Sequence, residues 1–114
     1  MYPTLALLTI VTLSTASADW PNDPSDVSAV EIAAFKTGIS MGCRSTGRNR
    51  GDPPQQVDRL CACMFAKLEA GLSPDEWRRA TFFAQRHQYR ELAQILNPKM
   101  EATKECSAEQ TPGA

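Results

Sequence analysis

Apolar residues recur along this chain at intervals of three and four, the spacing that places side chains on one face of an α-helix. The pattern is strongest over Pro54–Ala70, where six residues occupy positions i, i+3, i+4, i+7, i+8 and i+11: Val57, Leu60, Cys61, Met64, Phe65 and Leu68. Gly71 follows at the place of a helix C-terminal glycine. We therefore expect a helix over Pro54–Ala70 whose apolar stripe faces the core.

A second apolar stripe comes earlier in the chain and predicts a helix from about Ser25 to Gly42. Its members share the same helical spacing: Ile32, Phe35, Ile39 and Cys43. Ser28 and Glu31 have the spacing of a capping box, with Ser25 as an alternative N-cap. The segment Arg44–Pro54 follows with two Gly, two Pro and three Arg, and we expect a polar loop there.

The third helix has the clearest start signal in the sequence. Ser73 has the position of an N-cap, Pro74 that of the first helical residue, and Glu76 that of the capping-box acid. Leu72 and Trp77 flank this start at the spacing of a hydrophobic staple. The apolar pattern predicts a helix that continues from this start toward Gln88.

The C-terminal part of the chain continues the helical pattern. Leu92, Ile95 and Leu96 either extend the third helix or begin a short fourth one. Asn97-Pro98 repeats the arrangement of an N-cap and a first helical residue, which predicts a last helix reaching about Cys106. No run of four alternating β-branched residues predicts a strand. We expect an all-α fold: a single small domain of four or five short helices stapled by two disulfides.

The N-terminus has the pattern of a secretory signal peptide at residues 1–18. The run Leu5–Leu13 has nine residues, which suits the apolar region of a signal peptide and is too short to span a bilayer. Ala16-Ser17-Ala18 supplies small residues for cleavage, although no Lys or Arg precedes the run. We expect a helical domain at 19–106, a flexible tail at 107–114, and a periplasmic or secreted location.

Length and charge narrow the classes of function. The chain has 114 residues, with 12 Lys and Arg against 13 Asp and Glu, so it fits one domain with a net charge of −1. Nucleic-acid binding is not expected, because it normally needs a strong basic excess. No later stretch reaches the ~20 apolar residues of a membrane span, so no membrane span is expected after removal of the signal peptide.

Four cysteines form the main chemical signal, and four cysteines allow three pairings. They lie at Cys43, Cys61, Cys63 and Cys106. Cys61 and Cys63 point about 200° apart on a helix with 3.6 residues per turn, so they do not pair easily with each other. Because Cys43 and Cys61 both lie in apolar stripes, we favour Cys43–Cys61 with Cys63–Cys106. The crossed pairing, Cys43–Cys63 with Cys61–Cys106, stays open.

Metal and catalytic sites have weaker support. A zinc site usually presents paired cysteines in two knuckles, and a thiol oxidoreductase presents C-x-x-C at a helix N-terminus. Copper recruits Cys, Met and His, but Met41, Met64, Met100 and His87 show no clustered spacing. No motif of a hydrolase, metalloprotease or phosphate loop is present. We therefore expect no catalytic residues, no metal and no cofactor.

A basic stripe with two aromatic residues is the candidate protein-contact surface. Arg79, Arg86 and Arg90 have positions i, i+7 and i+11 of a continuous helix, and three residues lie nearby: Arg78, Phe82 and Phe83. Two adjacent aromatic residues on a helix cannot both face the core, so one is expected to be partly exposed.

The predicted function is binding of another protein of the cell envelope, as an inhibitor, immunity-type protein, chaperone or assembly accessory. The alternatives are copper or thiol-redox handling in the envelope, and a small structural subunit of an envelope complex.

Overall fold

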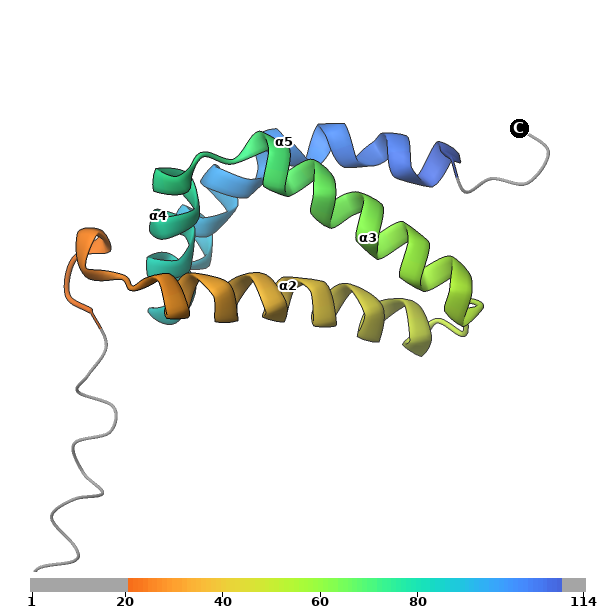
Figure 1. The fold of residues 1–114 in the computed structure, drawn as a ribbon, viewed down its shortest axis with the longest axis horizontal. Coiled ribbons are helices and arrows are strands. Elements are labelled where there is room, and N and C mark those ends of the chain that lie inside the picture. Colours follow the sequence, from red (N-terminus) through yellow and green to blue (C-terminus); the bar gives the residue numbers. More distant parts are fainter. Residues whose placement is uncertain (1–20, 110–114) are drawn as a thin grey trace, which may run out of the picture.

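The computed structural model describes residues 21–109, and they form an all-α fold (Figure 1). A 3-10 helix and four α-helices follow one another: η3 Pro24–Asp26, α2 Ala29–Asn49, α3 Pro54–Gly71, α4 Pro74–Gln85 and α5 Tyr89–Glu109. No strand occurs in this part of the chain. The predicted fold class is confirmed. The predicted signal peptide at residues 1–18 lies outside the described residues.

Helix α2 begins at the capping box of Ser28 and Glu31. The hydroxyl of Ser28 accepts from the N–H of Glu31 at 3.1 Å, and the carboxylate of Glu31 accepts from the N–H of Ser28 at 2.8 Å. Ser25, the alternative N-cap, lies instead in η3, where Asp23 accepts its N–H. The helix therefore starts at Ala29 rather than at about Ser25.

Helix α2 continues to Asn49, well beyond its predicted end at Gly42. The predicted polar loop is shortened because its first half is helical and packs against α3. Arg44 donates to Asp58 of α3 at 3.2 Å. Gly47 is buried, and a Cβ on it would lie 2.8 Å from the Cγ2 of Val57. Contacts with the next helix thus stabilise a segment whose own composition favours a loop.

Helix α4 has the predicted start but ends earlier than predicted. Ser73 and Glu76 form both hydrogen bonds of the capping box, at 3.1 and 2.9 Å. The helix ends at Gln85 because His87 adopts a left-handed conformation with φ of 58°. The N–H of Gln88 donates to the carbonyl of Phe83, and that of His87 to Ala84, the pattern of a Schellman motif.

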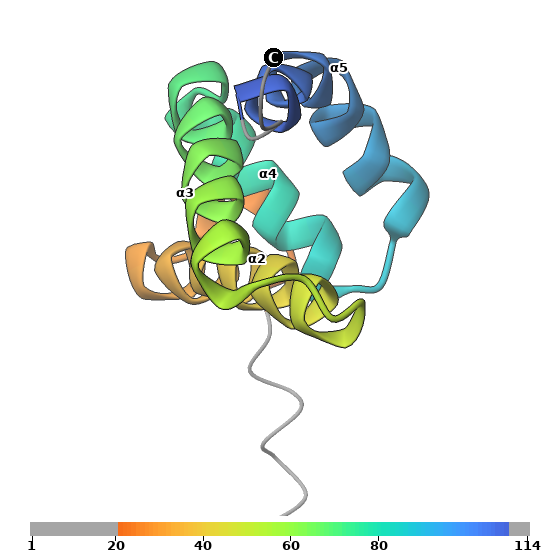
Figure 2. The same cartoon turned by 90° about the vertical axis from the view of Figure 1, so that its right-hand side faces the viewer.

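Helix α5 is continuous across Pro98, so the predicted helix start at Asn97-Pro98 is wrong. Proline lacks an N–H and cannot bond to the carbonyl of Gln94, and such a position usually bends a helix. Figures 1 and 2 show α5 bending along its length. The helix ends at Glu109, so residues 107–109 of the predicted tail are helical.

The core lies where α4 crosses the open end of the α2–α3 hairpin. Its buried members come from α3, α4, α5 and the α3–α4 connection: Leu68, Leu72, Trp77, Ala80 and Ile95. The ring of Trp77 lies 6.1 Å from that of Phe35 in α2 and 6.2 Å from that of Phe65 in α3. Helix α4 contacts α2 and α5, and α3 contacts both α2 and α5. Within the described residues, no Cα atom of α2 lies within 8 Å of a Cα atom of α5.

Candidate functional site

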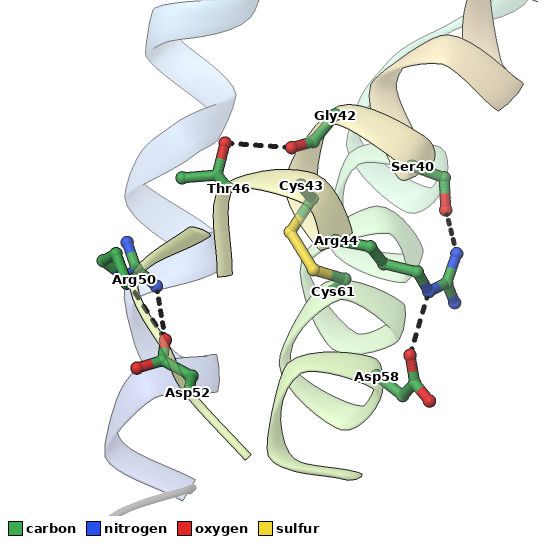
Figure 3. The surroundings of a disulfide bond; sticks show 9 residues. All are labelled: Ser40, Gly42, Cys43, Arg44, Thr46, Arg50, Asp52, Asp58 and Cys61. Atoms are coloured by element: carbon green, nitrogen blue, oxygen red, sulfur yellow. Dashed lines mark hydrogen bonds and ion pairs between the residues drawn. A yellow bond between two sulfur atoms is a disulfide. The ribbon is translucent and has the colours of Figure 1, made fainter. Parts of the chain in front are cut away.

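Two disulfides connect α3 to the helices on either side of it. Cys43 of α2 pairs with Cys61, and Cys63 pairs with Cys106 of α5, each with a Cα–Cα distance of 5.8 Å. The favoured pairing is confirmed. Because Cys61 and Cys63 point to different sides of α3, one bridge holds each side. The Cys43–Cys61 bridge lies in the half of the hairpin next to its turn (Figure 3).

A groove of about 470 Å³ lies beside the Cys43–Cys61 bridge. In the described part of the chain its lining residues come from α2, the turn, α3 and α5: Ile39, Gly42, Cys43, Thr46, Gly47, Arg50, Asp52, Gln56, Val57, Leu60, Cys61, Met64 and Ser107. Val57 and Cys61 are almost fully buried, and Leu60 and Met64 are half-buried. Gly42, Thr46 and Arg50 are exposed. The groove therefore has an apolar interior and reaches the surface.

The groove exists because α4 covers only one half of the hairpin. The apolar stripes of α2 and α3 continue toward the turn through Ile39, Leu60 and Met64. Helix α4 contacts the hairpin through Trp77, at the end that holds Phe35 and Phe65. Figure 2 looks at the hairpin from its turn, and α4 lies behind, toward the far end of the hairpin.

Charged groups lie at the border of the groove rather than in its interior. Among the described residues, Arg50 and Asp52 are the only charged ones that line it, and they form an ion pair at 2.9 Å. Figure 3 shows this pair on one side of the disulfide and the Arg44–Asp58 pair on the other. The interior accordingly suits an uncharged apolar group, since burial of an unpaired charge is costly.

The predicted protein-contact surface is divided among separate local contacts. Arg78 and Arg79 both pair with Asp75, at 3.8 and 3.1 Å. Phe82 is buried, with 8% of its surface exposed, and Phe83 is half-buried against the core. The partly exposed aromatic residue is therefore Phe83.

Arg86 stands at the C-cap of α4, whereas Arg90 lies on a different helix from Arg79. Arg86 caps the end of α4, donates to the carbonyl of Pro21 at 2.8 Å, and lies 4.6 Å above the ring of Phe82. Arg90 belongs to α5, beyond the break at His87. The continuous stripe is therefore interrupted, because its i+11 spacing assumed an unbroken helix.

Four carboxylates among the described residues have a lowered pKa because they accept hydrogen bonds at helix starts or between helices. Hydrogen bonds from the N–H groups of Ser28 and Ser73 lower the pKa values of Glu31 and Glu76. The N–H of Ser25 lowers the pKa of Asp23 in the same way, and Lys67 lowers that of Glu105. These carboxylates cap helices or join them, and none of them lines the groove.

Metal-ligand geometry is not found in the described part of the chain, where no three His, Cys, Asp or Glu side chains gather. All four cysteines are disulfide-bonded. Within residues 21–109, no helix has the length and apolar character needed to cross a membrane.

The comparisons with known proteins add no relative. No family model matches the chain, and neither a curated protein nor a solved structure matches it. The class of protein is defined by its fold and groove: a disulfide-linked helical domain with an open apolar groove beside one bridge.

Sequence reasoning missed the groove although it identified most of its apolar residues. The sequence pattern places Val57, Leu60 and Met64 on one apolar stripe, and in the structure this face of α3 lines the groove. The relative lengths of the helices could have indicated the groove. An α2–α3 hairpin of 21 and 18 residues is longer than the 12-residue α4 that packs on it, so part of its apolar stripe has no helix above it.

Proposed function

We propose that this protein is an exported helical domain that binds another protein through the groove between α2 and α3. The groove itself carries the proposal: an apolar, surface-reaching hollow of about 470 Å³. Concave apolar sites bordered by polar groups are typical of binding sites. The adjacent Cys43–Cys61 bridge restrains the two walls relative to each other, which lowers the entropic cost of binding.

The sequence pattern and the disulfides support export to the periplasm or the cell exterior. Residues 1–18 have the pattern of a signal peptide. Disulfides persist in oxidising compartments and are rare in the cytosol. The intact mass of the protein recovered from the envelope or medium should match a chain beginning at Asp19. Recovery of the chain with Met1 still attached would contradict export by cleavage.

Binding has more support than metal or thiol-redox handling. Thiol chemistry requires a free thiolate, and the sulfur atoms of all four cysteines are in disulfides. Met64 lines the groove, but its neighbours there include no His and no unpaired Cys. Methionine is also a flexible apolar residue that adapts to partner surfaces, and this property suits the proposed role.

Site-specific photo-cross-linking in cells of the source organism tests the proposed function. A benzophenone amino acid at Thr46, which is exposed on the border of the groove, should give a discrete adduct with one protein. The same amino acid at Arg90 tests the candidate protein-contact surface predicted from the sequence. Adducts from Arg90 and none from Thr46 would place binding at the arginine surface and contradict the groove.

A further inference from the structure

The half of the α2–α3 hairpin that α4 covers shows what kind of element fits on its apolar side. Helix α4 packs on α2 there, and the ring of its Trp77 lies 6.1 Å from that of Phe35 in α2 and 6.2 Å from that of Phe65 in α3. The exposed side of α4 carries charged residues such as Asp75 and Arg79. Thus one amphipathic helix already packs on the apolar stripes that continue into the groove.

The length of the groove matches a helix of the same size. Its lining residues run along α2 from Ile39 to Arg50, the C-cap residue that follows Asn49. At a rise of 1.5 Å per residue, this segment is about 16 Å long, which corresponds to about three helical turns. Helix α4, with 12 residues, has this length. The uncovered half could therefore accept a second helix as long as α4.

A partner in the groove could approach the backbone of α2 closely at Gly42, which has no side chain. A Cβ placed on Gly42 would meet no atom within 4 Å, so the space beside this glycine is open. Opposite it, Leu60 and Met64 present half-buried apolar side chains. An inserted helix would contact them with apolar side chains, and a charge on that face would be buried without a partner.

The segment beside the turn end of the groove carries a net positive charge. The segment 44–52 contains three arginines and one aspartate. Arg44 is paired with Asp58 and Arg50 with Asp52, while Arg48 is exposed in the last turn of α2. Charge complementarity at such a rim favours an acidic group on the partner.

We infer that the occupant of the groove is an amphipathic α-helix of a partner protein, about three turns long. Its contacting face is apolar and uncharged, and it carries acidic residues at the end that lies near Arg50. This inference rests on the proposed function, because it specifies the partner of the same groove.

Fluorescein-labelled peptides provide a defined probe. The test peptides have Leu and Ala on one face, Gln on the other, and two Glu residues in either the first or the last turn. A scrambled peptide keeps the composition without the apolar face, and a third peptide has Lys in place of Glu. Anisotropy titration with the mature protein should show that one acidic peptide binds at least tenfold more tightly than the scrambled one.

Matched variants locate the binding. Met64→Glu should weaken binding at least tenfold, whereas Met41→Glu, on an exposed part of α2 outside the groove, should leave it unchanged. Arg50→Glu should reverse the preference for Glu over Lys, whereas Arg59→Glu, exposed on α3 outside the groove, should not. Circular dichroism and melting of each variant separate loss of binding from loss of folding, and Leu60→Gln provides a second groove variant if Met64→Glu unfolds.

Three outcomes would overturn the inference. The first is equal binding of amphipathic and scrambled peptides. The second is a dimer in sedimentation experiments that Met64→Glu abolishes, since the groove would then hold a second copy of this chain. The third is displacement of the peptides by phosphatidylcholine vesicles, which would assign the groove to lipid. A protein adduct from Thr46 together with the first outcome would leave the proposed function standing and remove only the helical partner.

Discussion

The side chain of Val57 packs directly against the backbone of Gly47, at a distance that leaves no room for a Cβ atom. An ideal Cβ on Gly47 would lie 2.8 Å from one methyl carbon of Val57 and 3.0 Å from the other. Val57 is 3% exposed, and a β-branched side chain has few rotamers with which to move away. This contact brings the end of α2 against the start of α3, and both residues line the groove.

Gly47→Ala should therefore destabilise the protein, whereas Gly38→Ala should stabilise it. The Gly47 substitution forces atoms into a packed contact, which typically costs about 1–3 kcal/mol. A Cβ at Gly38 would meet nothing within 4 Å, and alanine is favoured over glycine inside a helix by up to about 1 kcal/mol. Urea unfolding measures both free energies. Changes of the same sign would contradict the packing described here.

The two disulfides should contribute unequally to stability. The Cys43–Cys61 bridge closes 18 residues and the Cys63–Cys106 bridge closes 43. Loop-closure entropy then gives roughly 3 and 4 kcal/mol. We expect the double substitution Cys63→Ser with Cys106→Ser to lower the free energy of unfolding more than Cys43→Ser with Cys61→Ser. Denaturant unfolding of the two variants checks the order, and identical unfolding of wild type and both variants would contradict the stapling role.

The capping boxes predict how stability depends on pH. The pKa of Glu76 is lowered from 4.5 in the folded state, mainly by the N–H of Ser73. Its contribution is therefore present above the unfolded pKa and is lost as the pH falls through the lower folded pKa. Stability should decrease as the pH falls below about 4.5, and Glu76→Gln should make this decrease shallower. An unchanged slope would contradict the cap.

Ser73→Ala tests the same cap at neutral pH. The hydroxyl of Ser73 accepts from the N–H of Glu76 at 3.1 Å, and loss of such a cap costs about 0.5–2 kcal/mol. Thermal melting should show the loss. Ser45→Ala, at an exposed position inside α2, provides a control that should change stability by less than about 0.5 kcal/mol.

Arg86 should matter for stability although its side chain is exposed. Its guanidinium group donates to Pro21 and lies over Phe82, and an exposed cation–π contact alone contributes about 0.5–1 kcal/mol. Arg86→Ala should lower the melting temperature, whereas Arg90→Ala on α5 should leave it nearly unchanged. Equal melting temperatures of the two variants would show that the contacts of Arg86 with Pro21 and Phe82 do not contribute to stability.

Local chemistry made parts of the fold predictable from sequence. The Ser73–Glu76 and Ser28–Glu31 caps each join residues three positions apart. The helix faces of Cys61 and Cys63 favoured the observed disulfide pairing but left the crossed pairing open. The two caps depend on geometry within a single helix start, so the sequence pattern was sufficient for them.

The errors occurred where distant contacts decide the structure. Helix α2 extends to Asn49 because residues of α3, including Val57 and Asp58, contact its last turns. Pro98 has the spacing of a helix start, yet α5 passes through it. The groove depends on where α4 stops covering the hairpin, which no periodicity along α2 or α3 reveals.

The yield of the Thr46 photo-adduct in two matched variants tests the central claim most directly. Met64 lines the groove, and Met41 is an exposed methionine on α2 outside it. We predict that Met64→Glu lowers the yield of the adduct at least tenfold while Met41→Glu leaves it unchanged, with both variants folded by circular dichroism. Equal yields in the two variants would contradict binding through the groove.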